Sequence, residues 1–212
     1  MNLHLAAPKP LKVQTYEILK EAIIRGILTD NEMMTEKRAA EQFQVSRTPF
    51  REAIQILESE GWVYTIPYKG TYISPITARD MEEVFELRVM LETSIVEKIL
   101  LNVSEDSLKR LEQLISIMKT NPAEQDDYEF MAIDHDFHKV IYELTNNKRI
   151  IGVFEQTSDT IRRIGVRVLH RKNRREEVIS EHMEIVKGLR DGTAGKALLE
   201  HLMKTKSSFS DL

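Results

Sequence analysis

The sequence predicts a mostly α-helical protein, in which a small unit of three helices and a β-hairpin precedes an antiparallel bundle of helices. Gly (8) and Pro (6) are scarce among the 212 residues, so few positions interrupt helices. Apolar residues recur every three to four positions through most of the chain, as in amphipathic helices. Two short β-like runs, at 62–66 and 71–74, flank a turn that reads Pro67-Tyr68-Lys69-Gly70.

The composition excludes several classes of protein. Apolar residues make up 42% and charged residues 30%, which excludes a wholly disordered chain. Because Cys is absent, there is no disulfide, no thiolate nucleophile and no Cys-based zinc site. No apolar run approaches the roughly 18 residues of a membrane span, and the N-terminus lacks a secretory signal, so we expect a cytoplasmic protein. The net charge of −4 does not indicate a nucleic-acid partner, so DNA binding must depend on local groups of charges.

The first 75 residues have the pattern of three helices and a hairpin. We expect the helices at 10–27, 35–43 and 47–60. Thr35 is suited to be the N-cap of the second helix. The pair Ser74-Pro75 marks the best boundary, so we predict one domain over 1–75 and a second over 76–212.

The second domain is predicted to be all helical. We expect six helices, at 77–101, 104–120, 126–145, 148–170, 174–190 and 194–207. Asn121-Pro122 ends the second of these helices. Short connections between successive helices favour an antiparallel bundle.

The third helix carries the strongest functional signal. Arg47 and Arg51 lie four residues apart on one face, with Thr48 beside them at the helix start. The opposite face carries the apolar residues Phe50, Ala53, Ile54 and Leu57. A helix, a short turn and this helix form a helix-turn-helix, from which arginine can bond guanine in a bidentate fork. The hairpin would add a wing with Lys69 and Gly70 at its tip; the alternative is that the arginines only solvate a surface helix.

Four polar side chains of the second domain are predicted to point into the bundle, namely Asp134, His138, His182 and His201. Each lies among apolar residues at helical spacing. Burying isolated polar groups costs free energy unless they find partners. A shared divalent metal would satisfy all four, since imidazole with carboxylate suits Zn, Ni, Mn or Fe. The alternative is that each histidine is a core residue bonded to a carbonyl.

Arginines form a further set of candidates. Arg88 lies beside apolar positions and could bind an effector carboxylate bidentately. Its alternative is an ion pair with Glu92, four residues on. The basic run from Arg162 to Arg175 is expected to be a solvated helix and loop, from which one arginine could still face a pocket.

One stretch of the first domain resembles the winged helix-turn-helix of the GntR family of bacterial transcription regulators. It begins at Thr35 and reads TEKRAAEQFQVSRTPFREAIQILESEGWV. The leading helix before it and the wing after it match the family in order. The resemblance implies operator contacts from Lys37, Arg47, Thr48, Arg51, Lys69 and Gly70. The family often has Arg where this chain has Lys37, and that exchange loses a bidentate fork.

The second domain resembles the FCD ligand-binding domain of the FadR subgroup, in its shorter six-helix, VanR-like branch. The matching stretches are Glu86 to Glu92, Asp134-x-x-Phe137-His138, Glu181-His182 and Ala197-x-x-x-His201-Leu202. The resemblance implies that the Asp and three His hold a divalent metal (Zn, Ni or Mn) that helps to bind a small carboxylate. One departure is that His182 and His201 lie only 19 residues apart, a shorter interval than is expected for the family.

Together these resemblances imply a homodimeric transcription regulator and not an enzyme. It would bind double-stranded operator DNA, and a small organic acid would control that binding, with repression relieved by the effector. A metal-dependent enzyme is the alternative from another class, since an open metal position could activate water. Glu181 would be its base, yet it lies about 100° round the helix from His182 and should point away from the metal. A metal-free helical interaction module is the third possibility.

Overall fold

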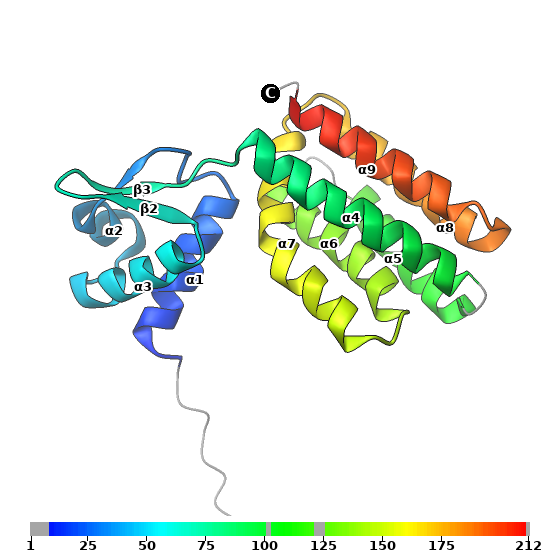
Figure 1. Ribbon diagram of the computed structural model, residues 1–212, viewed down its shortest axis with the longest axis horizontal. Coiled ribbons are helices and arrows are strands. Elements are labelled where there is room, and N and C mark those ends of the chain that lie inside the picture. The colour runs from blue at the N-terminus through cyan, green and yellow to red at the C-terminus, as the bar shows by residue number, and fades with distance from the viewer. Residues whose placement is uncertain (1–8, 101–102, 121–125, 211–212) are drawn as a thin grey trace, which may run out of the picture. The chain divides into compact units, whose positions relative to one another are not determined.

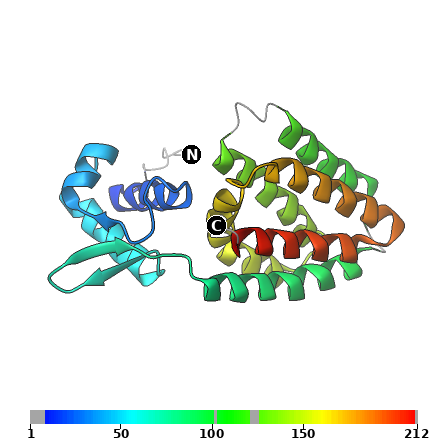
Figure 2. The same cartoon turned by 90° about the horizontal axis from the view of Figure 1, so that it is seen from above.

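The computed structural model describes residues 9–100, 103–120 and 126–210. Contacts divide the chain into two compact units, Met1–Pro75 and Ile76–Leu212, and each is described by itself (Figure 1, Figure 2). Most described residues are helical, which confirms the predicted fold class. None of the described helices is long and apolar enough to cross a membrane. The N-terminal segment, for which no secretory signal is expected, begins outside these residues.

The first unit holds three helices and a small sheet within its described residues. Its elements are α1 (Leu11–Ile24), β1 (Met33–Met34), α2 (Glu36–Phe43), α3 (Arg47–Ser59), β2 (Val63–Ile66) and β3 (Gly70–Ile73). The Thr35 side chain caps α2 by accepting a hydrogen bond from the Arg38 amide, as predicted. Gln44 ends α2 with φ at 55°, the left-handed conformation, and only Val45 and Ser46 then precede α3. This tight turn makes α2 and α3 a helix-turn-helix.

The strands form one antiparallel sheet in the order β1-β3-β2. β2 and β3 are the predicted hairpin, in which Tyr64 lies opposite Tyr72. β1 was not predicted, because its two residues carry no periodic pattern and only pairing with β3 defines it. α1 packs against α3, and the buried residues of these two helices include Leu19, Ile23 and Leu57. The sheet and the helices thus form a winged helix-turn-helix.

The second unit is a bundle in which six helices lie within the described residues. They are α4 (Ala78–Ile99), α5 (Glu105–Lys119), α6 (Asp127–Glu143), α7 (Lys148–Val168), α8 (Arg174–Asp191) and α9 (Ala194–Ser210). Thr77 and Ser104 cap α4 and α5, because their side chains accept from backbone amides of the first turn. The helix ends predicted at Leu101 and at Asn121-Pro122 lie outside the described residues.

Helices far apart in sequence surround one core. α9 packs on both α4 and α8, while α6 packs on α5, α7 and α4 (Figure 1). The most deeply buried side chains, each 2% exposed or less, include Phe85, Phe130, Phe137, Ile141, Ile185 and Leu198. The interior therefore receives side chains from α4, α6, α8 and α9.

A very short connection joins α8 to α9. Only Gly192 and Thr193 lie between the two helices, and Gly192 has φ at 87°, which a residue with a Cβ rarely adopts. Gly188 lies so close to Ala194 that a Cβ added to it would be 2.5 Å from the Ala194 backbone. This close approach lets the chain turn back within the 19 residues that separate the two candidate histidines.

Candidate functional site

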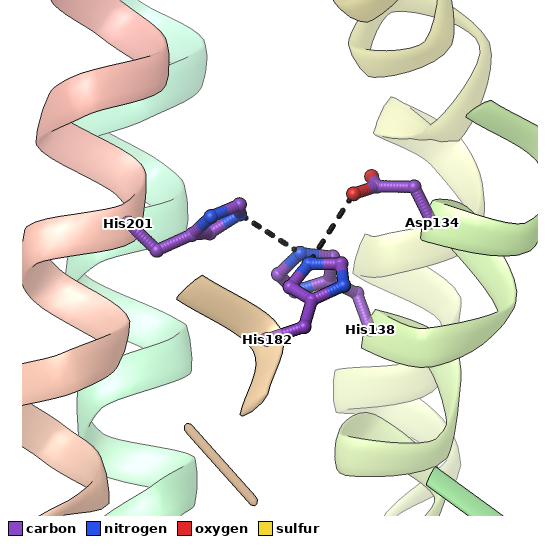
Figure 3. Close-up of side chains that lie close together, drawn as sticks. All are labelled: Asp134, His138, His182 and His201. Carbon is purple, nitrogen blue, oxygen red and sulfur yellow. Dashed lines mark hydrogen bonds and ion pairs between the residues drawn. The ribbon is translucent and has the colours of Figure 1, made fainter. Parts of the chain in front are cut away.

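Four buried side chains converge in the interior of the bundle (Figure 3). They are Asp134 and His138 on α6, His182 on α8 and His201 on α9, and none is more than 5% exposed. One potential ligand atom of each lies within 4.8 Å of those of the other three. These are the four residues that the sequence analysis selected, and the short interval before His201 does not displace it. Their role as metal ligands stays a prediction.

The side-chain atoms at the centre of this cluster lie close to one another, and those of His182 have no hydrogen-bond partner among the described residues. His138 Nε2 lies 3.3 Å from His201 Nε2, and His182 Nε2 lies 3.3 Å from Asp134 Oδ1. Among the described residues, neither ring nitrogen of His182 finds a hydrogen-bond partner. Phe137 stacks on the His182 ring at 3.9 Å between centroids, so the ring edge stays open towards the cluster. Because buried polar atoms are almost always paired, this arrangement indicates a partner such as a cation.

A buried glutamate holds the outer nitrogen of His138. Glu92 on α4 lies 2.9 Å from His138 Nδ1, and its other oxygen accepts from Arg88 Nε at 2.7 Å. Burial alone would raise the pKa of the Glu92 carboxyl, but the charge of Arg88 and the hydrogen bonds from His138 and Arg88 outweigh it and hold that pKa at about 2. The ionised carboxylate can only accept, so His138 Nδ1 is the donor of this hydrogen bond and Nε2 faces the cluster.

A second glutamate holds His201 in the same way. Glu181 lies 2.7 Å from His201 Nδ1 and accepts from the two Nη atoms of Arg174 at 2.8 and 3.0 Å. Burial raises the pKa of the Glu181 carboxyl, but the hydrogen bonds from His201 and Arg174 lower it to about 2. Glu181 lies outside the set of four converging donors and meets the outer nitrogen of His201, so the prediction that it points away from the metal is not contradicted. α9 packs on the side of α8 that carries Glu181, so this carboxylate is buried and reaches a cluster histidine.

The protonation states fit a metal site. Burial, together with the nearby His201, His138 and arginines, holds the pKa of His182 well below its ordinary value. Burial likewise lowers the pKa of His201. Neutral imidazole is the form that binds a metal, and three imidazoles with one carboxylate suit Zn, Ni or Mn. The donor set present therefore fits the ion that the resemblance implies.

A small cavity borders the cluster. It measures about 20 Å³, roughly the room that one water needs, and Arg88, Met131, Asp134, Arg174 and His201 are among the residues that line it. Arg88 Nη2 and Arg174 Nε are both buried, and neither finds a hydrogen-bond partner among the described residues. The guanidinium groups of Arg88 and Arg174 thus each have an N–H donor beside the cluster that no described residue accepts.

The arginines differ in part from the sequence predictions. Arg88 makes the ion pair with Glu92, the alternative to effector binding, and still lines the cavity. The basic run is not wholly solvated, since Arg163 is 4% exposed and Arg174 is 0% exposed. Arg174 is not among the site residues predicted from the sequence. Its spacing of seven from Glu181, two helical turns on the same face, was the available signal.

The candidate DNA-contacting residues of the helix-turn-helix lie on the surface of the first unit. The side chains of Lys37, Arg47 and Arg51 are 84%, 86% and 72% exposed, and Thr48 is also exposed. Arg51 Nε lies 2.6 Å from a Glu36 oxygen and Arg47 Nε lies 3.5 Å from the other. The buried apolar face of α3 keeps these side chains on the outside. Their contact with DNA stays a prediction.

The wing tip exposes a lysine between β2 and β3. The Lys69 amide donates to the Ile66 carbonyl at 3.0 Å, which closes the turn. Gly70 has φ at 136°, so the backbone here needs glycine. Lys69 is exposed and is available to a phosphate, and this role too stays a prediction.

Comparisons with known proteins agree with this architecture. The family model for bacterial regulatory proteins of the gntR family matches residues 11–73, and the FCD domain model matches residues 83–204. The uncharacterized HTH-type transcriptional regulator YdhC of Bacillus subtilis (strain 168) is 29% identical over 185 residues, 87% of this chain and 83% of that protein. The gluconate operon transcriptional repressor of the same strain is 30% identical over 123 residues, 58% of this chain and 50% of that protein.

A solved structure shares the fold along nearly the whole chain. The crystal structure of a GntR transcriptional regulator from Rhodococcus sp. RHA1 has a TM-score of 0.76 and 22% identity, and the match covers 94% of this chain and 97% of that one. The matching families are regulators and not enzymes, so the comparisons do not favour the metal-dependent enzyme. The chain belongs to the GntR family of bacterial transcription regulators, with a winged helix-turn-helix followed by an FCD domain.

Proposed function

We propose that this protein is a cytoplasmic repressor that binds operator DNA as a homodimer and responds to a small organic acid held at a divalent metal ion. The observation that supports it best is the buried set of four converging donor atoms beside two buried arginines. The effector would relieve repression by favouring one arrangement of the two reading heads over another.

The proposed ligands of the ion are Asp134, His138, His182 and His201. The unpartnered nitrogens of His182 support this assignment, because an ion would coordinate one of them without any change of fold. Four protein ligands leave positions open in an octahedral shell, where an effector carboxylate can bind. When bound, the ion supplies a positive charge that attracts the effector and stabilises the second domain.

The charges around the cavity favour an anionic effector. Two arginines and three carboxylates are buried there, which gives a net charge of −1 from Arg88, Arg174, Glu92, Glu181 and Asp134. A divalent ion changes the net charge of these buried groups to +1, and a single carboxylate would neutralise that charge. The spare Arg88 Nη2 donor supports a contact from Arg88 to that carboxylate. The name of one relative, a gluconate operon repressor, agrees with an organic acid.

The effector must change the bundle in order to enter. The cavity has room for only about one water, so a carboxylate of several atoms must displace part of its wall. Met131 is the most adaptable residue of that wall, because its unbranched side chain has several rotatable bonds. Coupling of the effector to the arrangement of the helices is therefore a direct consequence of the small cavity.

The proposed DNA contacts come from three places in the first domain. Arg47, Thr48 and Arg51 would reach base edges and phosphates from the start of α3. Lys37 would contact a phosphate from α2, and the wing at Lys69 and Gly70 would approach the minor groove or a phosphate. Two copies of the domain would read two half-sites, which makes the dimer necessary for a palindromic operator.

The first test is the metal content of untagged protein purified without chelator, measured by plasma mass spectrometry. We expect about one Zn, Ni or Mn per chain, since the four proposed ligands form one site. Small carboxylates are then added to metal-loaded and metal-stripped protein, and melting is followed. An organic acid should raise the melting temperature of the loaded protein only. No bound ion, even after reconstitution, would contradict the metal part of the proposal and leave the DNA part intact.

A further inference from the structure

Two similar hydrogen-bonded chains, each made of three side chains, end at the cluster of Asp134, His138, His182 and His201. In the first, Arg88 and Glu92 on α4 lead to His138 on α6. In the second, Arg174 and Glu181 on α8 lead to His201 on α9. Each chain runs from arginine to glutamate to the Nδ1 atom of a histidine.

Both chains are shielded from solvent. Arg88 and Glu92 are 4% and 0% exposed, and Arg174 and Glu181 are 0% and 8% exposed. Burying a charged pair costs free energy, so such pairs are weak devices for stability alone. The presence of two such buried pairs beside one cluster therefore indicates a role other than stability.

The hydrogen bonds show what that role is in the first chain. Glu92 gives one oxygen, Oε1, to Arg88 Nε and the other, Oε2, to His138 Nδ1. The arginine therefore fixes the carboxylate, and the carboxylate fixes the imidazole. The bond at Nδ1 turns the Nε2 atom of His138 towards the cluster.

The second chain is arranged in the same way, and its arginine holds the glutamate by two hydrogen bonds. Arg174 donates to both oxygens of Glu181, at 2.8 and 3.0 Å, and also donates to the Thr205 hydroxyl at 2.8 Å. Glu181 Oε2 in turn meets His201 Nδ1. The Nε2 atoms of both histidines consequently face each other across 3.3 Å.

We infer that Glu92 and Glu181 are positioning residues, which select the Nδ1–H tautomer of His138 and His201 so that both present Nε2 to a bound metal. This rests on the proposed metal site and goes beyond it, because neither glutamate is a ligand. It also gives α4 a part in the site, although α4 contributes none of the four converging side chains. Carboxylates that orient ligand histidines are a general feature of metal sites.

The test replaces each glutamate by its uncharged counterpart in the full chain. In Glu92→Gln and Glu181→Gln the carboxamide oxygen pairs with the arginine and the NH₂ group faces Nδ1, which moves the imidazole proton to Nε2. Zn²⁺ affinity, measured by competition with a chromophoric chelator, should fall 10- to 100-fold in each variant, as is usual for such outer partners. Glu97→Gln on α4 and Glu184→Gln on α8 are matched controls, because both side chains are exposed, and they should bind like the wild type.

A second measurement needs no metal. Two-bond ¹H–¹⁵N correlation spectra distinguish the imidazole tautomers of the metal-free wild type. The inference requires a proton on Nδ1 of both His138 and His201, whichever Nε2 carries the hydrogen of the Nε2–Nε2 contact. Glu92→Gln should change the pattern of His138 alone, and Glu181→Gln that of His201 alone. A merely structural glutamate would not produce this selective change.

The outcomes separate the inference from the proposed function. Wild-type Zn²⁺ affinity retained in both glutamine variants, or an unprotonated Nδ1 at His138 and His201 in the metal-free wild type, would overturn the positioning role. Absence of metal binding by the wild type would instead overturn the proposed metal site, and the tautomers would still decide the inference. Weaker binding in the glutamine variants, with unchanged controls and the selective tautomer shifts, would establish it.

Discussion

Glu36 on α2 is the acidic residue that lies against the two arginines of α3. It pairs with Arg51 at 2.6 Å and with Arg47 at 3.5 Å, and both arginine side chains are more than two-thirds exposed. An exposed pair of this kind contributes at most about 1 kcal/mol, so a base or a phosphate can displace it. Glu36 therefore orients the two arginines without preventing their proposed contact with DNA.

We predict that Arg47→Ala abolishes sequence-specific DNA binding and that Arg51→Ala weakens it by about 1–3 kcal/mol if Arg51 reads a base. The measurement is a titration of each variant against a duplex that the wild type has selected from a random pool. If Arg51 touches only phosphate, the loss is similar on random DNA and the salt slope falls by about one.

Arg79→Ala is the matched control for these two variants. Arg79 is 86% exposed on α4, so the change removes the same charge outside the first domain. It should leave specific binding unchanged. Sequence-specific binding that survives in Arg47→Ala would refute the assignment of α3 as the reading helix.

At the scale of elements, the turn between α8 and α9 decides whether the cluster can form. His182 and His201 lie on these two helices, and the two-residue connection leaves little freedom in their register. Gly188 permits the close approach, because only hydrogen separates it from the Ala194 backbone. A backbone contact cannot move aside as a flexible side chain would.

We predict that Gly188→Ala destabilises the protein by about 1–3 kcal/mol through overpacking, and that it weakens metal binding. The better helix propensity of Ala, about 1 kcal/mol, offsets only part of this cost. Chemical denaturation and Zn²⁺ titration check the two parts. Gly195→Ala on α9 is the control, because its added Cβ meets nothing within 4 Å and the change should be neutral or slightly stabilising. Equal stability of the Gly188 and Gly195 variants would show that the turn tolerates a wider spacing.

At the scale of the whole molecule, the proposed ion belongs to the second unit alone. All four converging residues follow Ile76, and the first unit has its own buried core. An ion that binds only the folded bundle stabilises it by mass action, by about 2.7 kcal/mol at a free concentration 100 times the Kd. The metal should therefore act on the melting of one unit and not of the other.

We predict that a chelator lowers the melting temperature of the second unit by several degrees in the metal-loaded wild type. His182→Ala should lose this sensitivity along with metal affinity, because the central imidazole is gone. Calorimetry with and without chelator measures both. His135→Ala is the control, since His135 lies on α6 beside Asp134 but bonds to Ser158, at 2.9 Å, and not to the cluster. A chelator effect that persists in His182→Ala would place the ion elsewhere.

Features that depend on local spacing could be predicted from the order of residues alone. A helix presents residues four apart on one face, so the arginine face of α3 and the inward positions of Asp134 and His138 follow from the order of residues. Turn and capping residues such as Thr35 located the helix starts for the same reason. The stretch around Arg47 also sufficed to indicate the GntR family, which the comparisons confirm.

Which helices are neighbours became known only from the three-dimensional packing, and so did every contact between two elements. β1 exists because β3 lies beside it, and its two residues carry no signal of their own. Glu181 has an outward position when α8 is considered alone, yet α9 covers it and makes it a partner of His201. Arg174 looked solvated for the same reason. Helical periodicity gives the direction of a side chain from its own axis, whereas burial and hydrogen bonding depend on the element that packs on that side.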